Sequence, residues 1–327
     1  MFGYLNVKYN MSELNYEHVF NVLVDKTAEY VTSNNLKAMV LGISGGIDST
    51  VVAAICHEVS KKTGIPLIGR SLPIKNKSDE FGVSKLVGQA FCNEFSIVYI
   101  EGVYKELLDF ITATEIDAPA IRIVPNLAQT SIANGNIQAR LRMIYLYNLA
   151  SIHKGLVMST DNQTEYQLGF WTIHGDVGDF DPIQDLWKTE VYELAKWISN
   201  RYKNIEHHHT IMTGAGSKSD AIELSIALTP TDGLGISNSD LEQIGAKDYD
   251  TVDDILSRFV PFENFRKSYD SAGQIMHPHD EMAESDCWSQ LCARHGEDVV
   301  NKVWSRHLAS EFKRKKAPIY ISRELYE

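Results

Sequence analysis

The stretch Ser44-Gly45-Gly46-Ile47-Asp48-Ser49-Thr50 decides the fold and most of the chemistry of this chain. The apolar run before it, residues 38–43, is typical of a buried parallel strand, and residues 51–56 after it open a helix. A strand, a glycine turn and a helix together point backbone N–H groups and a helix N-terminus at an anion. We therefore predict a phosphate-binding loop at residues 44–50.

The residue types in this loop fit a phosphate site with a metal ion. The two glycines let the chain turn tightly and a phosphate approach the backbone, while the hydroxyl groups add donors. Asp48 would repel a phosphate unless a cation lay between them, and Mg²⁺ favours this combination of carboxylate and phosphate oxygens. A plain Gly-Ser turn capping a helix is the alternative, which the hydroxyls and the carboxylate disfavour. Neither the Walker A spacing nor the G-x-G-x-x-G spacing occurs here.

Composition sets wide limits on the class of protein. The 327 residues are 44% hydrophobic and 23% charged, which is ordinary for a globular protein. A net charge of −12 argues against a protein that wraps nucleic acid. The four cysteines show no paired zinc spacing, and no apolar run reaches the roughly 18 residues of a membrane span. With no secretory signal pattern, we expect a cytoplasmic protein without membrane or nucleic-acid partners.

Strand-like and helix-like segments alternate over the first two-thirds of the chain. We expect strands at residues 38–43, 66–72, 96–100 and 156–160, and helices at residues 13–33, 79–93 and 137–153. This alternation predicts an α/β fold with a doubly wound parallel sheet, and ligands at the carboxyl ends of its strands. Ser159-Thr160-Asp161-Asn162 ends the fourth strand, so it should converge with the glycine loop.

The last third is less regular. Residues 203–230, which include His207-His208-His209, are interpreted as a surface loop insertion. Three consecutive histidines suit a metal site poorly, because successive side chains point in different directions. Residues 257–300 hold aromatic side chains among charged ones, which indicates helical packing or a lid.

The glycine loop resembles the SGGxDS motif of the ATP pyrophosphatases, and five further segments narrow the resemblance. These are Leu72-Pro73-Ile74 with Asp79-Glu80, residues 135–143, residues 159–176, Pro182-Ile183 with Lys188-Thr189, and Pro230-Thr231-Asp232. In this order they resemble the NAD synthetases over about residues 38–256, and the resemblance resumes at residues 312–318. The resemblance implies an adenine nucleotide alpha hydrolase-like (Rossmann-like) domain over residues 1–256. A helical C-terminal extension over residues 257–327 would return to the active site at 312–318.

The resemblance also implies roles for individual residues. The ATP contacts would be Gly42, Ile43, Ser44, Gly45, Gly46, Ile47, Asp48, Ser49, Thr160, Lys188 and Thr231. Asp48 and Glu165 would hold Mg²⁺ and, with Lys188, form the catalytic group. Arg140, Asp179 and Lys313 would contact deamido-NAD. Ile173 and Phe312 stand where ammonia-dependent members carry a lysine and a histidine, so these two positions depart from the family pattern.

The implied reaction is a carbon–nitrogen ligation. The carboxylate of deamido-NAD would attack ATP to give an adenylate and pyrophosphate, and ammonia would then displace AMP and leave NAD. Only 37 residues precede the first expected strand, so we expect free ammonia, or ammonia from a separate glutaminase partner. The family's substrate site implies a homodimer. Two alternatives stay open: another ATP pyrophosphatase (an amidotransferase synthetase or a tRNA-modifying enzyme), or a catalytically silent nucleotide-binding protein.

Overall fold

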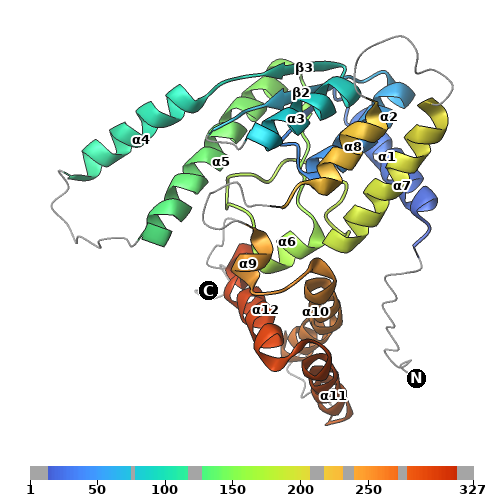
Figure 1. Ribbon diagram of the computed structural model, residues 1–327, viewed down its shortest axis with the longest axis vertical. Helices are drawn as coiled ribbons and strands as arrows, with labels where there is room; N and C mark the ends of the chain where they lie inside the picture. Colours follow the sequence, from blue (N-terminus) through green and yellow to red (C-terminus); the bar gives the residue numbers. More distant parts are fainter. Residues whose placement is uncertain are drawn as a thin grey trace, which may run out of the picture. The chain divides into compact units, whose positions relative to one another are not determined.

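The computed structural model describes residues 14–74, 78–116, 127–206, 217–230, 239–271 and 278–314 (Figure 1). The strands are β1 Met39–Gly42, β2 Leu67–Ser71, β3 Glu94–Ile97 and β4 Leu156–Val157. The helices are α1 Tyr16–Ser33, α2 Ile47–Thr63, α3 Ser78–Phe91, α4 Glu101–Ile116, α5 Leu127–Ile152, α6 Gln163–Leu168, α7 Lys188–Glu206, α8 Lys218–Ala227, α9 Asp240–Ile244, α10 Tyr249–Ser271, α11 Pro278–His295, α12 Glu297–Ala309 and α13 Glu311–Arg314.

The described residues form two compact units. The larger unit holds residues 14–163 and 171–240, with a four-stranded parallel sheet in the order β3-β2-β1-β4. Val40 and Leu41 in β1 are fully buried, because helices cover both faces of the sheet. This explains the uninterrupted apolar run before the glycine loop.

The two faces of the sheet are covered by different helices (Figure 1). Met39 and Leu41 pack into a cluster formed with α1, α2, α3, α7 and α8. Val40, whose side chain points the opposite way, packs into a second cluster formed with α4 and α5. The predicted α/β fold with a doubly wound parallel sheet is therefore confirmed.

The elements β3, α5 and β4 differ most from their expected bounds. β3 begins at Glu94 because Asn93 already bonds to Leu67 through both its backbone N–H and its side-chain oxygen. α5 begins about ten residues before the expected start, since its first turns lack an apolar stripe that would mark a helix. β4 has only two residues: the Met158 N–H still donates to the Val40 carbonyl of β1 at 2.8 Å, but the next bridge of Met158 is an isolated one with Phe180.

The interpretation of residues 203–230 as a surface loop is wrong for most of its described part. Residues 203–206 finish α7, and α8 follows with a capping box between Ser217 and Asp220. Ser219 and Ser225 on α8 are buried, since small side chains let α8 pack closely against its neighbours. The sequence hid this because serine is usually a turn residue. His207-His208-His209 lies outside the described residues.

The smaller unit consists of described residues 164–170 and 241–314 and is helical. Its centre is aromatic: the ring of Phe259 lies 5.1 Å from that of Trp288 and 5.0 Å from that of Trp304. Phe259 and Trp288, two of the aromatic residues noted in the sequence, thus pack between helices. The expected domain boundary between residues 256 and 257 falls inside α10.

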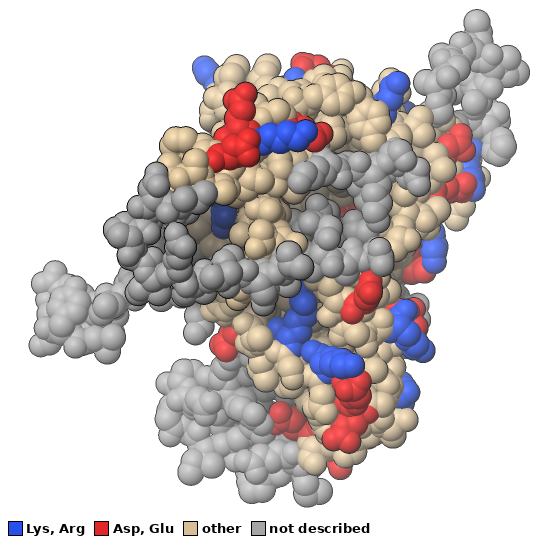
Figure 2. Space-filling model, turned by 60° about the vertical axis from the view of Figure 1, so that its left-hand side comes forward, with Lys and Arg blue, Asp and Glu red and all other residues tan. Residues whose placement is uncertain are grey.

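The described helices and the charged side chains bear on membrane and surface properties. No helix of the described part of the chain is long and apolar enough to cross a membrane. In the view of Figure 2, lysine and arginine side chains lie among aspartates and glutamates rather than apart from them. Pairs such as Lys26–Glu29 and Lys302–Asp298 are examples of this mixing.

Candidate active site

The glycine loop joins the carboxyl end of β1 to α2, as the sequence predicts. Gly45 has a φ of 92°, which a residue with a side chain adopts only with strain, so glycine is required there. Gly46 is the N-cap of α2 and has no side chain to cap the first turn. The N–H groups of that turn are therefore available to an anion, which the helix dipole also favours.

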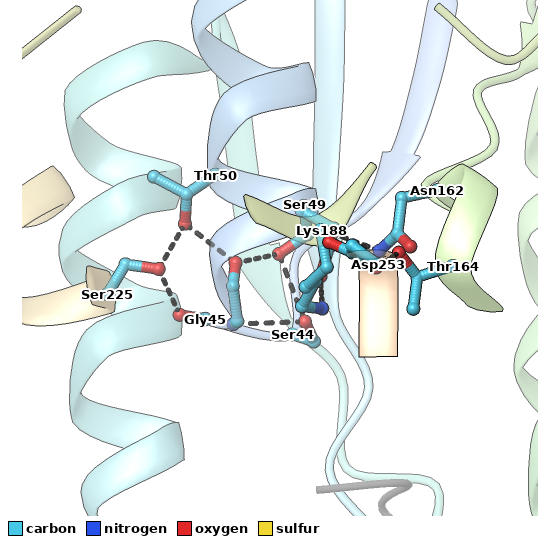
Figure 3. Close-up of polar contacts among 11 residues, drawn as sticks. Ser44, Gly45, Ser49, Thr50, Asn162, Thr164, Lys188, Ser225 and Asp253 are labelled. Carbon is cyan, nitrogen blue, oxygen red and sulfur yellow. Dashed lines mark hydrogen bonds and ion pairs between the residues drawn. The ribbon is translucent and has the colours of Figure 1, made fainter. Parts of the chain in front are cut away.

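Hydroxyl groups hold the loop in shape (Figure 3). The Ser44 and Ser49 hydroxyl oxygens lie 3.0 Å apart, and the Gly46 N–H donates to the Ser44 oxygen at 3.2 Å. Ser49 Oγ and Thr50 Oγ1 each donate to the Gly46 carbonyl at 2.9 Å. The hydroxyl groups of the loop thus hold its backbone in this shape.

A further brace comes from α8, in a region that the sequence did not connect with the site. Ser225 Oγ donates to the Gly45 carbonyl at 2.8 Å and lies 2.9 Å from Thr50 Oγ1 (Figure 3). Ser225 is buried and 180 residues from Gly45 in the chain. Sequence reasoning missed it, because a serine inside a helix carries no signal of a distant partner.

Asp48 lies at the centre of a charged group. Lys188 Nζ, at the start of α7, donates to Asp48 Oδ2 at 2.6 Å, and Asn162 Nδ2 donates to Oδ1 at 2.8 Å (Figure 3). The Lys188 side chain is only 3% exposed and that of Asp48 15%. The glycine loop, the end of β4 and α7 therefore converge on one carboxylate, as predicted for the sheet edge.

The segment after β4 is held by its own polar network. Ser159 Oγ donates to Asp161 Oδ2 at 2.9 Å and accepts from the Gly178 N–H at 3.1 Å. Thr160 between them is half-buried. Asp179 accepts from the Val157 N–H at 2.9 Å, so its carboxylate supports the edge of the sheet.

Asp181 was not singled out from the sequence. Its Oδ1 accepts from the Ile183 N–H at 3.0 Å, whereas its Oδ2 is buried with no hydrogen-bond partner among the described residues. Burial, with a smaller contribution from the charge of Asp48, raises the pKa of this carboxyl to about 7. An aspartate before a proline offers no sequence signal of this burial.

Arg140 projects from α5 toward a loop of the same unit. Its Nη2 donates to the Ile173 carbonyl at 3.0 Å, and the residue is exposed. A guanidinium has five N–H donors, so this contact leaves others for a ligand. Ile173 thus contacts Arg140 through its backbone, and its side chain does not replace the charge of a lysine.

Glu165 and Lys313 belong to the smaller unit, and their roles stay predictions. Glu165 lies in the first turn of α6. Lys313 Nζ donates to the Gly169 carbonyl at 2.6 Å. Thr231 lies outside the described residues.

Comparison with known proteins points to a single family. The family model described as NAD synthase matches residues 19–317. An NH(3)-dependent NAD(+) synthetase of Methanocaldococcus jannaschii is 31% identical over 245 residues, covering 74% of this chain and 81% of the relative.

Two solved structures share the fold. An NMN synthetase from Francisella tularensis is 22% identical with a TM-score of 0.65, covering 95% of this chain and 100% of that chain. An NH3-dependent NAD synthetase from Campylobacter jejuni, in complex with nitrate, is 20% identical with a TM-score of 0.57, covering 94% and 100%. With a family model that matches most of its length, this chain belongs to the NAD synthase family.

Proposed function

We propose that this protein is a ligase that converts deamido-NAD, ATP and ammonia into NAD, AMP and pyrophosphate through an adenylate intermediate. The observation that carries the proposal is the convergence of the glycine loop, Lys188 and Asn162 on Asp48. The names of similar proteins, which are NH(3)-dependent NAD(+) synthetases, supply the reaction class.

The glycine loop would bind the phosphates of ATP. Its N–H groups and the α2 N-terminus face the anion, while Ser44 and Ser49 add hydroxyl donors. Lys188 would add positive charge where pyrophosphate departs, and its buried pair with Asp48 aims it at the loop. A carboxylate becomes a good electrophile once AMP is attached, so the remaining task is to position ammonia and the adenylate.

The residues fit a magnesium ion bound together with nucleotide. Each oxygen of Asp48 accepts one hydrogen bond from a described residue, and a carboxylate has room for further partners. The described residues contain no group of three histidine, cysteine or acidic side chains that could hold a metal alone. Mg²⁺ needs only one or two carboxylates beside phosphate oxygens, and Asp48 with Glu165 would supply them. Bound there, the ion would neutralise charge on the departing pyrophosphate.

Arg140 and Asp179 are our proposed contacts on the side of the acid substrate. Arg140 is exposed and its fork suits a phosphate or carboxylate. Asp179 would act through the sheet edge that it supports. We expect Arg140→Ala to raise the KM for deamido-NAD about tenfold and leave the KM for ATP nearly unchanged. An equal effect on both constants would contradict this division into two binding sides.

We also propose a homodimer formed by α4 and α5. These helices pack against each other (Figure 1). They expose large apolar side chains: Val103, Phe110, Ile111, Ile132, Ile144, Tyr147 and Ile152. Large apolar side chains exposed on two neighbouring helices favour an interaction site. A second copy of the chain is the partner that the family resemblance favours.

Pyrophosphate release tests the proposed reaction. We expect it only when ATP, Mg²⁺ and deamido-NAD are all present, with ammonium supporting NAD formation. Nicotinate mononucleotide should be compared as the acid, since one similar structure is named an NMN synthetase. Faster turnover of the mononucleotide would change the assigned substrate, and ATP binding without pyrophosphate release would favour the silent nucleotide-binding protein. Activity with glutamine in protein free of any glutaminase would contradict the use of ammonia alone.

A further inference from the structure

Glu165 lies on a helix too short to be stable by itself. α6 has six residues and ends at Leu168, and Gly169 directly after it has a φ of 66°. The Phe170 N–H donates to the Glu165 carbonyl at 3.0 Å and the Gly169 N–H to the Tyr166 carbonyl at 3.4 Å, the pattern of a Schellman motif. Isolated helices of this length do not persist in water, so contacts at its ends must hold α6.

The beginning of α6 is attached to α10. Thr164 Oγ1 donates to Asp253 Oδ1 at 2.5 Å, and both residues are buried (Figure 3). Asp253 therefore fixes the residue directly before Glu165.

The end of α6 is attached to α12 and α13. The Gln167 carbonyl accepts hydrogen bonds from His307 Nδ1 at 3.0 Å, Ser310 Oγ at 3.2 Å and Arg314 Nη1 at 2.7 Å. These are among the carbonyls that a helix leaves without an internal partner. A cation at this end of a helix is also favoured by its dipole.

Two more cations complete the same contact. Arg306 Nε donates to the Leu168 carbonyl at 3.3 Å, with its guanidinium 3.7 Å from the centre of the Phe170 ring. Lys313 Nζ donates to the Gly169 carbonyl at 2.6 Å. Side chains of the C-terminal segment thus bind the last two carbonyls of α6, those of Gln167 and Leu168, and the Gly169 carbonyl that follows.

The residues of α12 and α13 that contact α6 are themselves held by hydrogen bonds and ring stacking. Arg314 Nη1 donates to Ser310 Oγ at 2.8 Å, and Nη2 donates to the His307 carbonyl at 2.9 Å. The His307 ring stacks on Trp304 with centroids 4.6 Å apart. A Cβ at Gly169 would lie 2.5 Å from Ser310 Cβ, so this close approach requires glycine.

We propose that Lys313 and Arg314 are positioning residues that fix α6 and thereby set the place and direction of the Glu165 carboxylate. On this proposal the Lys313 ammonium acts through the Gly169 carbonyl and not through deamido-NAD. The inference rests on the proposed function of Glu165 as a magnesium ligand.

The test compares Lys313→Met and Arg314→Met with a matched control, Lys302→Met. Lys302 lies on α12 and pairs with Asp298, away from the carbonyls of α6. Mn²⁺ affinity is measured by electron paramagnetic resonance with α,β-methylene-ATP, which needs no turnover. Hydrogen exchange of the α6 amides and the KM for deamido-NAD are measured on the same proteins.

We expect both variants to weaken Mn²⁺ binding about tenfold, as loss of one charge-assisted hydrogen bond predicts, and to speed exchange in α6. The KM of these two variants for deamido-NAD should stay nearly unchanged. The control Lys302→Met should behave as the unmodified protein. The conservative variant Lys313→Arg should keep its Mn²⁺ affinity. A raised KM for deamido-NAD with normal Mn²⁺ binding in Lys313→Met would overturn the positioning role. So would faster exchange with Mn²⁺ binding unaltered in both variants. An unmodified protein that binds no Mn²⁺ with the nucleotide would instead contradict the metal role of Glu165.

Discussion

At the level of single residues, Asp48 and Lys188 form an ion pair in a largely buried part of the site. Lys188 is the first residue of α7, and a cation at a helix N-terminus is unfavourable. Its side chain is nevertheless 3% exposed, and the carboxylate 2.6 Å away is the charge that offsets this cost. A buried ion pair contributes little net stability, but either partner left alone is costly. The pair is therefore best explained by chemistry at the glycine loop.

Substitution of one or both partners separates stability from turnover. Asp48→Asn should lower turnover about a hundredfold or more, because it removes a metal contact. It should also lower the free energy of unfolding by about 1–3 kcal/mol, since Lys188 loses its counter-charge. Adding Lys188→Met should restore most of the stability and none of the turnover. Urea unfolding and pyrophosphate release measure the two effects, and near-normal turnover of Asp48→Asn at saturating Mg²⁺ would make the carboxylate structural.

Asp181 predicts how stability depends on pH. Its pKa is about 7 in the folded protein against an ordinary value of 3.8, with burial as the main cause. Between these values the folded protein keeps a proton that the unfolded chain has released. The contribution of Asp181 to the free energy of unfolding is therefore complete below about pH 4. As the pH rises to about 7, this contribution is lost, and the free energy of unfolding falls by at most about 4 kcal/mol.

Asp181→Asn should remove this dependence, because the amide stays neutral. The melting temperature of the variant should match that of the unmodified protein near pH 4 and exceed it at pH 8. Asp185→Asn, at an exposed neighbouring position, is the control and should change neither value. A constant difference between Asp181→Asn and the unmodified protein at every pH would show that the carboxyl does not titrate in this range.

At the scale of elements, the active-site loop depends on a helix that follows it by more than 160 residues. α8 reaches the loop through Ser225, which contacts the Gly45 carbonyl and the Thr50 hydroxyl. The buried small residues of α8 allow this approach. The shape of the phosphate site is thus shared between the loop and α8.

Ser225→Ala should raise the KM for ATP several-fold, because the loop loses a hydrogen bond worth about 1 kcal/mol. Ser219→Ala is a matched control on the same helix, since Ser219 is buried and lies 2.9 Å from the Ser199 hydroxyl instead. Both variants should melt at lower temperature, and only Ser225→Ala should alter the KM for ATP. Equal constants in the two variants would show that α8 supports the fold but not the loop.

At the scale of the whole molecule, α4 and α5 cover one face of the sheet and still expose apolar side chains outward. Ile144 is 65% exposed and Phe110 66%. We expect Ile144→Glu to turn the proposed dimer into a monomer, as a charge placed in an apolar interface disfavours association. Sedimentation velocity measures the change. Leu224→Glu, at an exposed apolar position on α8, is the control and should keep the dimer; a monomeric unmodified protein would contradict the proposed interface.

The fold class, the family resemblance and the glycine loop could all be predicted from the sequence. An apolar run, a Gly-Gly turn and a helix are local signals, because each depends on residues adjacent in the chain. The parallel sheet with helices on both faces followed from the same alternation, whereas the strand order did not. The meeting of the glycine loop with residues 159–162 at one sheet edge could be predicted, since carboxyl ends of parallel strands lie together.

The distant polar groups that support that edge could be identified only from the packing of the folded chain. Ser225, Asp181 and the donors that bind the end of α6 carry no local signal, because serine, aspartate and arginine occur equally on solvated surfaces. Lys313 shows the difference: the resemblance implied a substrate contact, which stays a prediction, and the structure adds a hydrogen bond from its ammonium to the Gly169 carbonyl. Burial and hydrogen-bond partners are set by packing between segments more than a hundred residues apart, which adjacent residues do not encode.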